Sequence, residues 1–533
     1  MIPAPPARAE GIPSTAALQR GGTLMILVAL MLLGAALRLI NLGDQSLWRD
    51  EAIALIFARE PTLASVIAAV SDHELHPPAW YVVLHITLRV WGDSEFALRL
   101  WPAFCGILLI PAGYALGARL FNPIIGLLNA LLICVSPFLL RYSQEGRPYT
   151  VLALLATVCL YAAARWLQRP RWRHLLIFTL IGAGMLYTHN WGFFLLAAIN
   201  LYALIALANR SGRRGLLILW LAGNALIGVL YLPWLPTFIR ELGYDTGWMS
   251  LSDPPGVLLW QTLEAWTAGG RINAVYLGLA ALGAAGVLSL RWHPLRLALS
   301  ERAGALMLVL VTCLVPLLIA LALSAQKPLY KPDRYTIIVY PAFSLLLAAG
   351  LGLWRFRRLA LLAAVLVAAL WLRKDVTLLT QPYKSTAREA AAYVAGVIQP
   401  SDVLVFAPDT IGQSFNYYFR GPQFQIGFAN WTAPVSWHIG SYVEAWRQPG
   451  IIPQTLAEID AHLPEAGCVF LVFTPGPVAI PGAEHHTEVL AEWLGARYRL
   501  TTRIDLPERF EQIDVARYCR ESAADGPPSV PGG

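Results

Sequence analysis

The chain has 533 residues, of which 57% are hydrophobic and 14% are charged, and its mean hydropathy is +0.54. Soluble domains carry roughly 25% charged residues, so the composition excludes an ordinary soluble protein and indicates an integral membrane protein. The net charge of +7 does not indicate a nucleic-acid partner, because most Lys and Arg lie in short clusters between apolar segments, where membrane topology explains them.

The first segment, residues 1–22, is rich in Pro and Ala, and we predict a disordered cytoplasmic tail there. The apolar segment near 24–40 is too long for the core of a signal peptide and lacks a small-residue cleavage site. We therefore predict a retained first membrane span.

Further apolar segments have nearly the length of about 17–25 residues that a bilayer requires. They lie near 97–118, 122–140, 149–167, 174–189, 190–208, 215–236, 273–290, 303–324, 335–353 and 358–373. A polytopic α-helical membrane protein with about eleven transmembrane helices is therefore predicted.

The apolar segment 79–91 decides the topology, because it is short and contains His85 and Arg89. If it does not cross the membrane, the Arg-containing loops at 169–174, 209–215, 291–296 and 355–358 all fall on the cytoplasmic side with the N-terminus. Counting it as a span would invert every one of them, against the positive-inside rule. We therefore predict an interfacial helix along the membrane surface.

This topology places five polar segments and the C-terminal tail outside the cytoplasm. The segments are 41–96, 141–149, 187–192, 237–271 and 326–335. The tail alternates helix-like and strand-like segments, so we predict an extracytoplasmic α/β domain over 375–522, followed by a disordered end over 523–533. Cys468 and Cys519 lie in this tail and either pair or remain free thiols.

Asp50 and Glu51 are adjacent acids directly after the first span. One interpretation is structural, since acids stabilise the positive end of a helix dipole by about 0.3–1 kcal/mol. The other is functional, because a Ser or Thr would cap a helix as well without placing charge beside the membrane. Both interpretations stay open on the local pattern.

Three histidine-containing or basic segments add candidate site residues on the same side. "SDHELHPP" places His73, Glu74 and His76 within four residues, and such side chains are ligands for Zn and related metals. Their spacing fits no closed zinc site, so His189 from another loop would have to contribute. The alternative is a solvated turn stiffened by two prolines.

The loop "RYSQEGRPYT" contains Arg141, Gln144, Glu145, Arg147 and Tyr149 between two spans. Arginine forks suit phosphate oxygens, whereas interfacial anchoring by Arg and Tyr explains the same composition.

In "KPLYKPDRYT", Lys331 and Arg334 lie beside a span on the side that should be poor in positive charge. This departure favours an anionic partner such as a lipid phosphate, although Asp333 partly neutralises Arg334.

The motifs together resemble the bacterial glycosyltransferase family 39-like proteins of the GT-C class, which are related to protein O-mannosyltransferases and lipid A aminoarabinose transferases. The similarity covers roughly residues 24–375. It is carried by "SLWRDEA", "HPPAWYVVLHITLRVWGDSEFALRLW", "SPFLLRYSQEGRPYTVLALL", "YTHNWGFFLL" and "PDRYTIIVYPAF". The resemblance implies a GT-C transmembrane catalytic domain over 23–374, with interfacial helices in its first outer loop.

The resemblance also implies a polyprenyl-phosphate sugar donor and an acceptor hydroxyl on a lipid, glycan or protein. The family's catalytic acid matches Asp50, with Glu51 beside it and Glu145 as a second acid. Donor-phosphate contacts would come from Arg141, Arg147, Lys331 and Arg334, and acceptor or sugar contacts from Gln144 and Tyr149. Where relatives hold a divalent metal, Glu74 and His189 match, with His73 and His76 nearby.

The expected activity is inverting sugar transfer in the bacterial inner membrane, with the active site outside the cytoplasm and Asp50 as general base. A phosphate leaving group needs charge stabilisation but no protonating acid, so one carboxylate suffices where a glycosidase needs two. The alternative is a transporter or flippase of a lipid-linked glycan. A transporter predicts ionisable residues near the middle of the membrane, whereas here they lie at the ends of spans.

Overall fold

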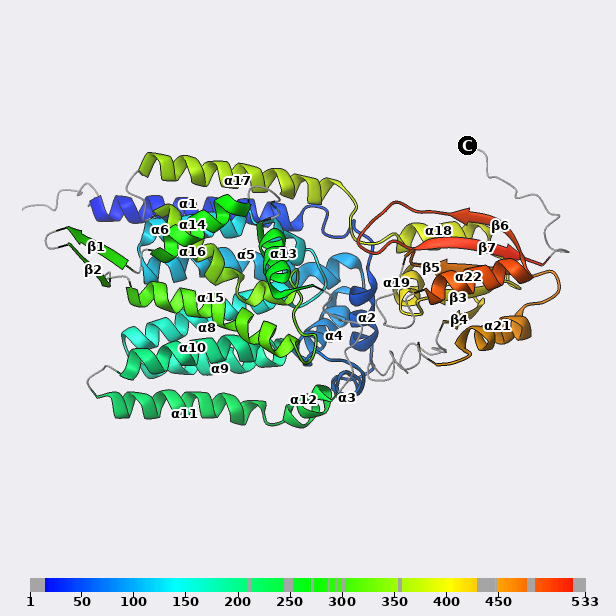
Figure 1. Cartoon of the computed structure of the whole chain (residues 1–533), viewed down its shortest axis with the longest axis horizontal. Coiled ribbons are helices and arrows are strands. Elements are labelled where there is room, and N and C mark those ends of the chain that lie inside the picture. Colours follow the sequence, from blue (N-terminus) through cyan, green and yellow to red (C-terminus); the bar gives the residue numbers. More distant parts are fainter. Residues whose placement is uncertain are drawn as a thin grey trace, which may run out of the picture.

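The computed structural model describes residues 15–208, 212–243, 253–267, 269, 273–285, 288–292, 295–299, 303–352, 357–428, 446, 448–476 and 485–520. These residues form a bundle of long helices and, beside one end of it, a sheet flanked by helices (Figure 1). We call the end of the bundle beside the sheet the domain-facing end.

Each of the predicted spans corresponds to at least one helix. The helices are α1 (Thr15–Leu39), α5 (Glu95–Leu120), α6 (Pro123–Cys134), α7 (Pro137–Ser143), α8 (Tyr149–Gln168), α9 (Trp172–Thr188), α10 (Gly192–Ala208), α11 (Arg213–Tyr231), α14 (Asn273–Ala285), α15 (Ala303–Ser324), α16 (Tyr340–Gly352) and α17 (Arg357–Thr380). Among the described residues, five helices are long and apolar enough to cross a membrane, or six if α6 and α7 form one bent span. The protein is therefore a multi-pass membrane protein, and the count of eleven spans stays a prediction.

The predicted span 122–140 is broken rather than continuous. Helices α6 and α7 meet at an angle of 56°. The Ser136 hydroxyl accepts a hydrogen bond from Leu139 N at the start of α7, and Pro137 occupies the first turn. Proline lacks the N–H that a continuous helix requires, and it disfavours helical geometry in the residue before it. The break therefore follows from the Ser-Pro pair.

The first outer loop folds into α2 (Arg49–Ala58), α3 (Leu63–His73) and α4 (Ala79–Trp91). All three lie at the domain-facing end (Figure 1), and α12 (Leu235–Leu242) lies there too. The predicted helix over 79–91 matches the bounds of α4. At 13 residues, α4 is shorter than the about 17 residues that a span requires.

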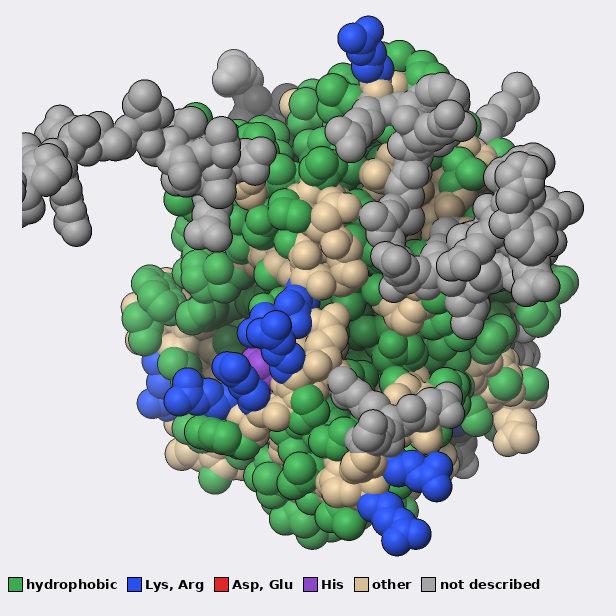
Figure 2. All heavy atoms as spheres, turned by 90° about the vertical axis from the view of Figure 1, so that its left-hand side faces the viewer, with side chains coloured by type: hydrophobic (Ala, Val, Ile, Leu, Met, Phe, Trp, Pro, Cys, Tyr) green, Lys and Arg blue, Asp and Glu red, His purple; other side chains and the backbone are tan. Residues whose placement is uncertain are grey.

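The opposite end of the bundle is basic. Figure 2 shows Lys and Arg side chains on this face and no Asp or Glu among its described residues. Arg119, Arg165 and Arg169 lie close enough to repel one another electrostatically. The same end carries a hairpin of β1 (Leu288–Trp292) and β2 (Leu295–Leu299) (Figure 1). The hairpin corrects the predicted span 273–290, whose helix α14 ends at Ala285.

The C-terminal domain, residues 385–520, contains a five-stranded sheet in the order β4-β3-β5-β7-β6. The strands are β3 (Val403–Ala407), β4 (Phe424–Gly427), β5 (Cys468–Phe473), β6 (Arg499–Ile504) and β7 (Asp514–Cys519). Strands β4, β3 and β5 are parallel, whereas β7 is antiparallel to β5 and β6. The flanking helices are α18 (Ala387–Val397), α19 (Ile411–Tyr418), α21 (Ile451–His462) and α22 (His486–Arg497).

Two boundaries differ from the prediction. Helix α17 continues to Thr380, so the predicted domain boundary at 375 lies inside a helix. Helix α1 begins at Thr15, inside the predicted disordered tail. Residues 1–14 and the predicted disordered end 523–533 lie outside the described part of the chain.

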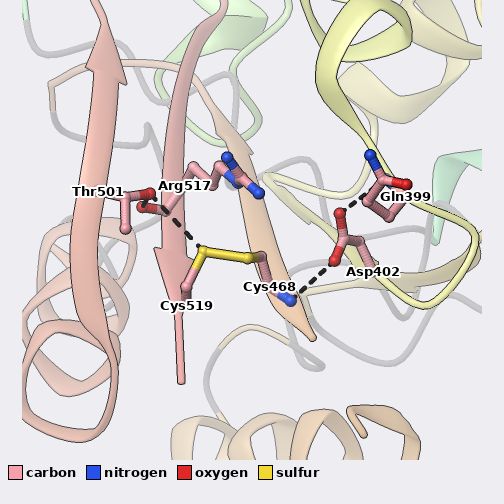
Figure 3. The surroundings of a disulfide bond; sticks show 6 residues. All are labelled: Gln399, Asp402, Cys468, Thr501, Arg517 and Cys519. Carbon is pink, nitrogen blue, oxygen red and sulfur yellow. Dashed lines mark hydrogen bonds between the residues drawn. A yellow bond between two sulfur atoms is a disulfide. The ribbon is translucent and has the colours of Figure 1, made fainter. Parts of the chain in front are cut away.

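Cys468 and Cys519 form a disulfide between β5 and β7 (Figure 3). The two cysteines are direct partners in the antiparallel register of these strands. Asp402 accepts a hydrogen bond from Cys468 N at 2.8 Å (Figure 3) and fixes the start of β5. Of the two states left open by the sequence, the structure therefore has the paired one.

Candidate active site

Asp50 lies in the first turn of α2, at the domain-facing end of the bundle. Its Oδ2 accepts a hydrogen bond from Arg334 Nη1 at 3.0 Å, and its Oδ1 lies 3.9 Å from Arg49 Nε. The Asp50 side chain remains 24% exposed. Asp50 is thus held by two cations and is still accessible to a substrate.

Glu51 is fully buried, and its carboxylate is enclosed by donors. Arg99 donates to both of its oxygens at 2.8 Å, and Lys384 Nζ and Gly146 N donate to Oε1 at 3.1 and 2.7 Å. Burial alone would raise the pKa of Glu51, but Arg99, Lys384 and these hydrogen bonds lower it to about 2. A carboxylate so enclosed cannot reach a substrate, so its geometry favours a positioning role over the predicted catalytic one.

The loop before α2 is fixed from the bundle side by Arg99. Its Nη1 donates to the carbonyl oxygens of Leu42 and Gln45 at 3.1 and 2.9 Å, and its Nη2 donates to that of Ser46 at 3.3 Å. One buried guanidinium therefore joins Glu51 to the preceding loop and sets where α2 begins.

Glu145 is buried, and among the described residues its Oε1 has no hydrogen-bond partner. Burial raises the pKa of Glu145 to about 7, and the charges of Lys384 and Arg141 oppose this rise. A carboxyl group with this pKa changes protonation near neutral pH. Glu145 is therefore a second titratable acid beside the Glu51 and Lys384 pair.

Gln144 and Tyr149 are the predicted acceptor or sugar contacts, and both side chains are buried. The Gln144 amide donates to Ile40 O at 2.8 Å, just beyond the end of α1. The Tyr149 ring is buried against Tyr142 with ring centroids 4.9 Å apart. Both residues support the wall of the site.

Arg141 and Arg334 both contact the aromatic ring of Phe510, which belongs to the C-terminal domain. Their guanidinium carbons lie 5.2 and 5.4 Å from the ring centroid. Arg334 also lies 4.8 Å from the Trp48 ring. Burial and the neighbouring Arg334 lower the pKa of Lys331. Arg334 and Lys331 therefore lie beside Asp50, and Arg141 contacts the same Phe510 ring as Arg334.

Arg147 is more deeply buried than the other predicted phosphate ligands. Its Nη1 donates to Tyr81 Oη at 3.3 Å and to Asp50 O at 3.5 Å, and its Nη2 lies 3.4 Å from His76 Nδ1. Its Nε has no hydrogen-bond partner among the described residues. Arg147 thus connects the Asp50 backbone to the histidine cluster.

The predicted metal ligands lie next to this region. Glu74 Oε1 shares a hydrogen bond of 2.9 Å with His76 Nδ1, and the rings of His76 and His189 are 5.0 Å apart. Burial would raise the pKa of Glu74, yet its bond to His76 contributes to a pKa of about 2. Burial lowers the pKa of His189 well below its usual value, so its imidazole is neutral at pH 7.

These side chains form an incomplete ligand set. Within the described ranges, no three His, Cys, Asp or Glu side chains are arranged to hold a metal ion. One Glu74 oxygen is already bonded to His76, and His73 lies at the last position of α3. His189 Nε2 is buried, has no hydrogen-bond partner among the residues that the structure describes, and is the atom best placed to ligate. The set does not fit a metal held by the protein alone.

Four residues of the site were missed by the sequence interpretation, namely Arg99, Lys384, Phe510 and Glu511. Lys384 is buried between Glu51 and Gln144, and it donates to the Gln144 carbonyl oxygen and to Glu51. Burial and Arg99 lower the pKa of Lys384 to about 8. Arg99 could have been noticed, because it is a charged residue inside the apolar segment 97–118. The other three residues lie in the tail, where no motif marks them.

Comparisons with known proteins identify a similar family and similar folds. The family model of the dolichyl-phosphate-mannose-protein mannosyltransferases matches residues 75–236. No protein of curated function matches the sequence.

Similar solved structures include ArnT from Cupriavidus metallidurans in the apo state, with 15% identity and a TM-score of 0.58 over 96% of this chain and 100% of that chain. The same protein bound to undecaprenyl phosphate is 14% identical to this chain, with a TM-score of 0.59. The match covers 95% of this chain and 99% of that chain. A third similar structure is the oligosaccharyltransferase AglB from Archaeoglobus fulgidus in complex with an inhibitory peptide and a dolichol-phosphate. It is 13% identical to this chain, with a TM-score of 0.51 over 96% of this chain and 75% of that chain. The resemblance to the GT-C class, including its fold, is confirmed.

Proposed function

We propose that this chain, which shares its fold and a family motif with the GT-C glycosyltransferases, is a membrane transferase. It moves a sugar from a polyprenyl-phosphate donor to an acceptor hydroxyl. The observation that carries the proposal is an accessible carboxylate, Asp50, bonded to Arg334 beside Arg141 and Lys331. A base next to several cations suits a reaction in which a hydroxyl attacks and a phosphate leaves.

In the proposed reaction, the acceptor oxygen attacks the anomeric carbon while the bond from that carbon to the phosphate oxygen breaks. Asp50 takes the acceptor proton, and the polyprenyl phosphate leaves with the bonding electrons on the opposite face, so configuration inverts. Arg334, Arg141 and Lys331 stabilise the charge that develops on the phosphate. Among the described residues, Glu74, His76 and His189 do not form a complete ligand set, so the proposed steps use only the side chains named above.

The Asp50–Arg334 ion pair couples the two substrates. A donor phosphate that binds Arg334 competes with Asp50 for the same N–H groups. Donor binding thereby releases the Asp50 carboxylate, which can then accept the proton of the acceptor hydroxyl.

Two neighbours support the class of donor. ArnT has been solved bound to undecaprenyl phosphate, and AglB has been solved in complex with a dolichol-phosphate. Both proteins share the fold of this chain, so the same bundle architecture accommodates a polyprenyl phosphate.

We propose that the domain-facing end lies outside the cytoplasm of a bacterial inner membrane. The basic opposite end (Figure 2) fits the cytoplasmic side by the positive-inside rule. The Cys468–Cys519 disulfide fits an oxidising compartment for the C-terminal domain.

The test is sugar transfer by purified protein in liposomes that contain a polyprenyl-phosphate sugar. Asp50→Asn keeps the shape of the side chain and removes the base, so we expect kcat to fall by about 10²- to 10⁴-fold. Asp44→Asn is the control, because Asp44 is an exposed acid of the same loop, and it should leave kcat unchanged. Equal kcat values for Asp50→Asn and Asp44→Asn would show that Asp50 is not the general base.

The alternative function, a flippase of a lipid-linked glycan, predicts a different product. A transferase releases free polyprenyl phosphate, whereas a flippase leaves the donor chemically intact. Chromatography of the extracted lipids separates these outcomes without knowledge of the acceptor.

A further inference from the structure

The segment between β6 and β7 extends from the C-terminal domain to the loop in front of α2. Its backbone pairs with the linker after α17, since Phe510 N donates to Tyr383 O at 2.9 Å and Glu511 N donates to Lys384 O at 2.7 Å. This pairing holds the backbone of Phe510 and Glu511 next to the buried Lys384, whose side chain donates to Glu51. The position of the two side chains is therefore set by the bundle and the domain together.

The first turn of helix α2 is not capped by its own N-cap residue. That residue is Trp48, whose side chain makes no capping hydrogen bond. The Arg49 amide instead donates to both oxygens of Glu511 at 3.1 Å. An acid at this place satisfies an unpaired N–H and complements the positive end of the helix dipole. Glu511 thus caps the helix that carries Asp50, although 462 residues separate it from Arg49.

The Glu511 carboxylate is itself held in place. Ser385 Oγ and Ser414 Oγ donate to its Oε2 at 2.9 and 3.1 Å, and the side chain is buried. Because these donors come from the C-terminal domain, the cap moves with the domain and not with α2. The amide of Leu47 is bonded to the same domain, through Tyr418 Oη at 2.8 Å.

Phe510 has an unusual place for an aromatic side chain. It is 46% exposed and does not belong to the core of the C-terminal domain. The guanidinium carbons of Arg141 and Arg334 both lie within 5.4 Å of its ring centroid, and the ring packs edge-on against Trp48, with ring centroids 5.1 Å apart. An aromatic ring that contacts two cations helps to hold them in place and still leaves their N–H groups free to bind an anion.

We propose that Phe510 and Glu511 are positioning residues of the active site, Glu511 as the cap of the catalytic helix and Phe510 as the aromatic support of the two donor-phosphate arginines. The inference rests on the proposed function, because it gives these residues a part in sugar transfer. It assigns the C-terminal domain a specific task, which is to complete a site that the bundle alone leaves uncapped.

The first test measures amide hydrogen exchange of α2 in the full chain. Glu511→Ala should raise exchange in a peptide covering residues 46–58 by about fivefold or more. Glu511→Gln keeps an acceptor for the Arg49 amide and should restore most of the protection. Asp402→Ala is the matched control: Asp402 is another buried acid of the same domain that accepts backbone N–H bonds, from Gln399 and Cys468. Equal exchange in α2 for Glu511→Ala and Asp402→Ala would overturn the role of Glu511.

The second test measures affinity for undecaprenyl phosphate, the simplest probe of the donor site. Phe510→Ala should weaken binding by about fivefold. Phe424→Ala removes a partly exposed phenylalanine that stacks on His462 of the same domain, and it should leave binding unchanged. Wild-type affinity in Phe510→Ala would overturn the role of Phe510 as support of the two arginines.

Kinetics separate the two tasks. Glu511→Ala should lower kcat about tenfold with little change in the KM for the donor, because it displaces the base. Phe510→Ala should mainly raise that KM. If the wild-type chain transfers no sugar, the proposed function fails, while exchange and binding still decide the inference. If Glu511→Ala does not fold, Ser385→Ala is the substitute variant, because it removes one hydrogen-bond donor to Glu511. It should raise amide exchange in α2 to a smaller extent. Unchanged exchange in this variant would contradict the capping role of Glu511.

Discussion

Glu145 is a buried carboxyl group whose Oε1 has no partner in the described part of the chain, and burial raises its pKa to about 7. The unfolded chain loses this proton near the ordinary pKa of 4.5. Stability therefore falls as pH rises from about 4.5 to about 7, and the cost above this window is on the order of 3 kcal/mol. Glu145→Gln removes the charge, so we expect its melting temperature in detergent to exceed that of wild type at pH 8, with little difference at pH 5.

Glu51→Gln is the control for this titration, because the pKa of Glu51 is instead lowered to about 2. Its stabilising charge is present at all pH values above about 4.5 and is lost only in acid. Glu51→Gln should therefore lower the melting temperature at both pH 5 and pH 8. A gain for Glu145→Gln that does not depend on pH would contradict the assigned titration.

At the scale of elements, α2 is placed by a fork of hydrogen bonds from Arg99. Arg99 binds both oxygens of Glu51 and the loop carbonyls at 42, 45 and 46. Lysine keeps the charge but cannot form this fork, so Arg99→Lys should lower kcat for sugar transfer by about 10- to 100-fold through misplacement of Asp50. Arg89→Lys, at an exposed arginine of α4, is the control and should keep wild-type kcat. Wild-type kcat in Arg99→Lys would show that the loop does not set the position of the base.

The same elements show what the sequence could predict. Hydropathy marks the helices of the bundle, and length with charge distinguishes α4 from a span. Asp50, Arg141, Lys331 and Arg334 stand out because a charge beside a membrane needs a reason. Hydropathy does not reveal the break before Pro137, because apolar residues continue on both sides of the Ser-Pro pair, from "LLICV" to "FLL".

Glu511 could not be predicted as a cap, because capping motifs are local and this one is formed between residues far apart in the chain. The hairpin β1–β2 was also missed. The arginines of "LRWHPLR" fit a cytoplasmic loop by the positive-inside rule, so the segment gave no reason to expect strands. Separating Glu51 from Asp50 also required Arg99, Gly146 and Lys384, which only the folded chain brings together.

At the scale of the whole molecule, the disulfide links the stability of the C-terminal domain to the active site. Cys468 and Cys519 are separated by 51 positions, and closing such a loop stabilises a fold by about 4 kcal/mol in the chain-entropy model. Replacing both cysteines by Ser should lower the melting temperature of the domain and reduce sugar transfer, because Phe510 and Glu511 depend on it. Reductant should reproduce both effects in wild type and change neither in the Ser variant. Full sugar-transfer activity after the C-terminal domain has melted would show that the active site does not depend on the folded domain.

The orientation of the whole molecule can be tested with single cysteines introduced at the two ends of the bundle. Arg214 lies at the start of α11, whereas Glu60 follows α2 at the domain-facing end. In intact cells, a membrane-impermeant maleimide should label Glu60→Cys and leave Arg214→Cys unlabelled until the membrane is permeabilised. The four free native cysteines, Cys105, Cys134, Cys159 and Cys313, lie within helices of the bundle, so the unmodified chain provides a low background. The reverse labelling pattern would place Asp50 and the disulfide in the cytoplasm, where a reducing environment disfavours the bond.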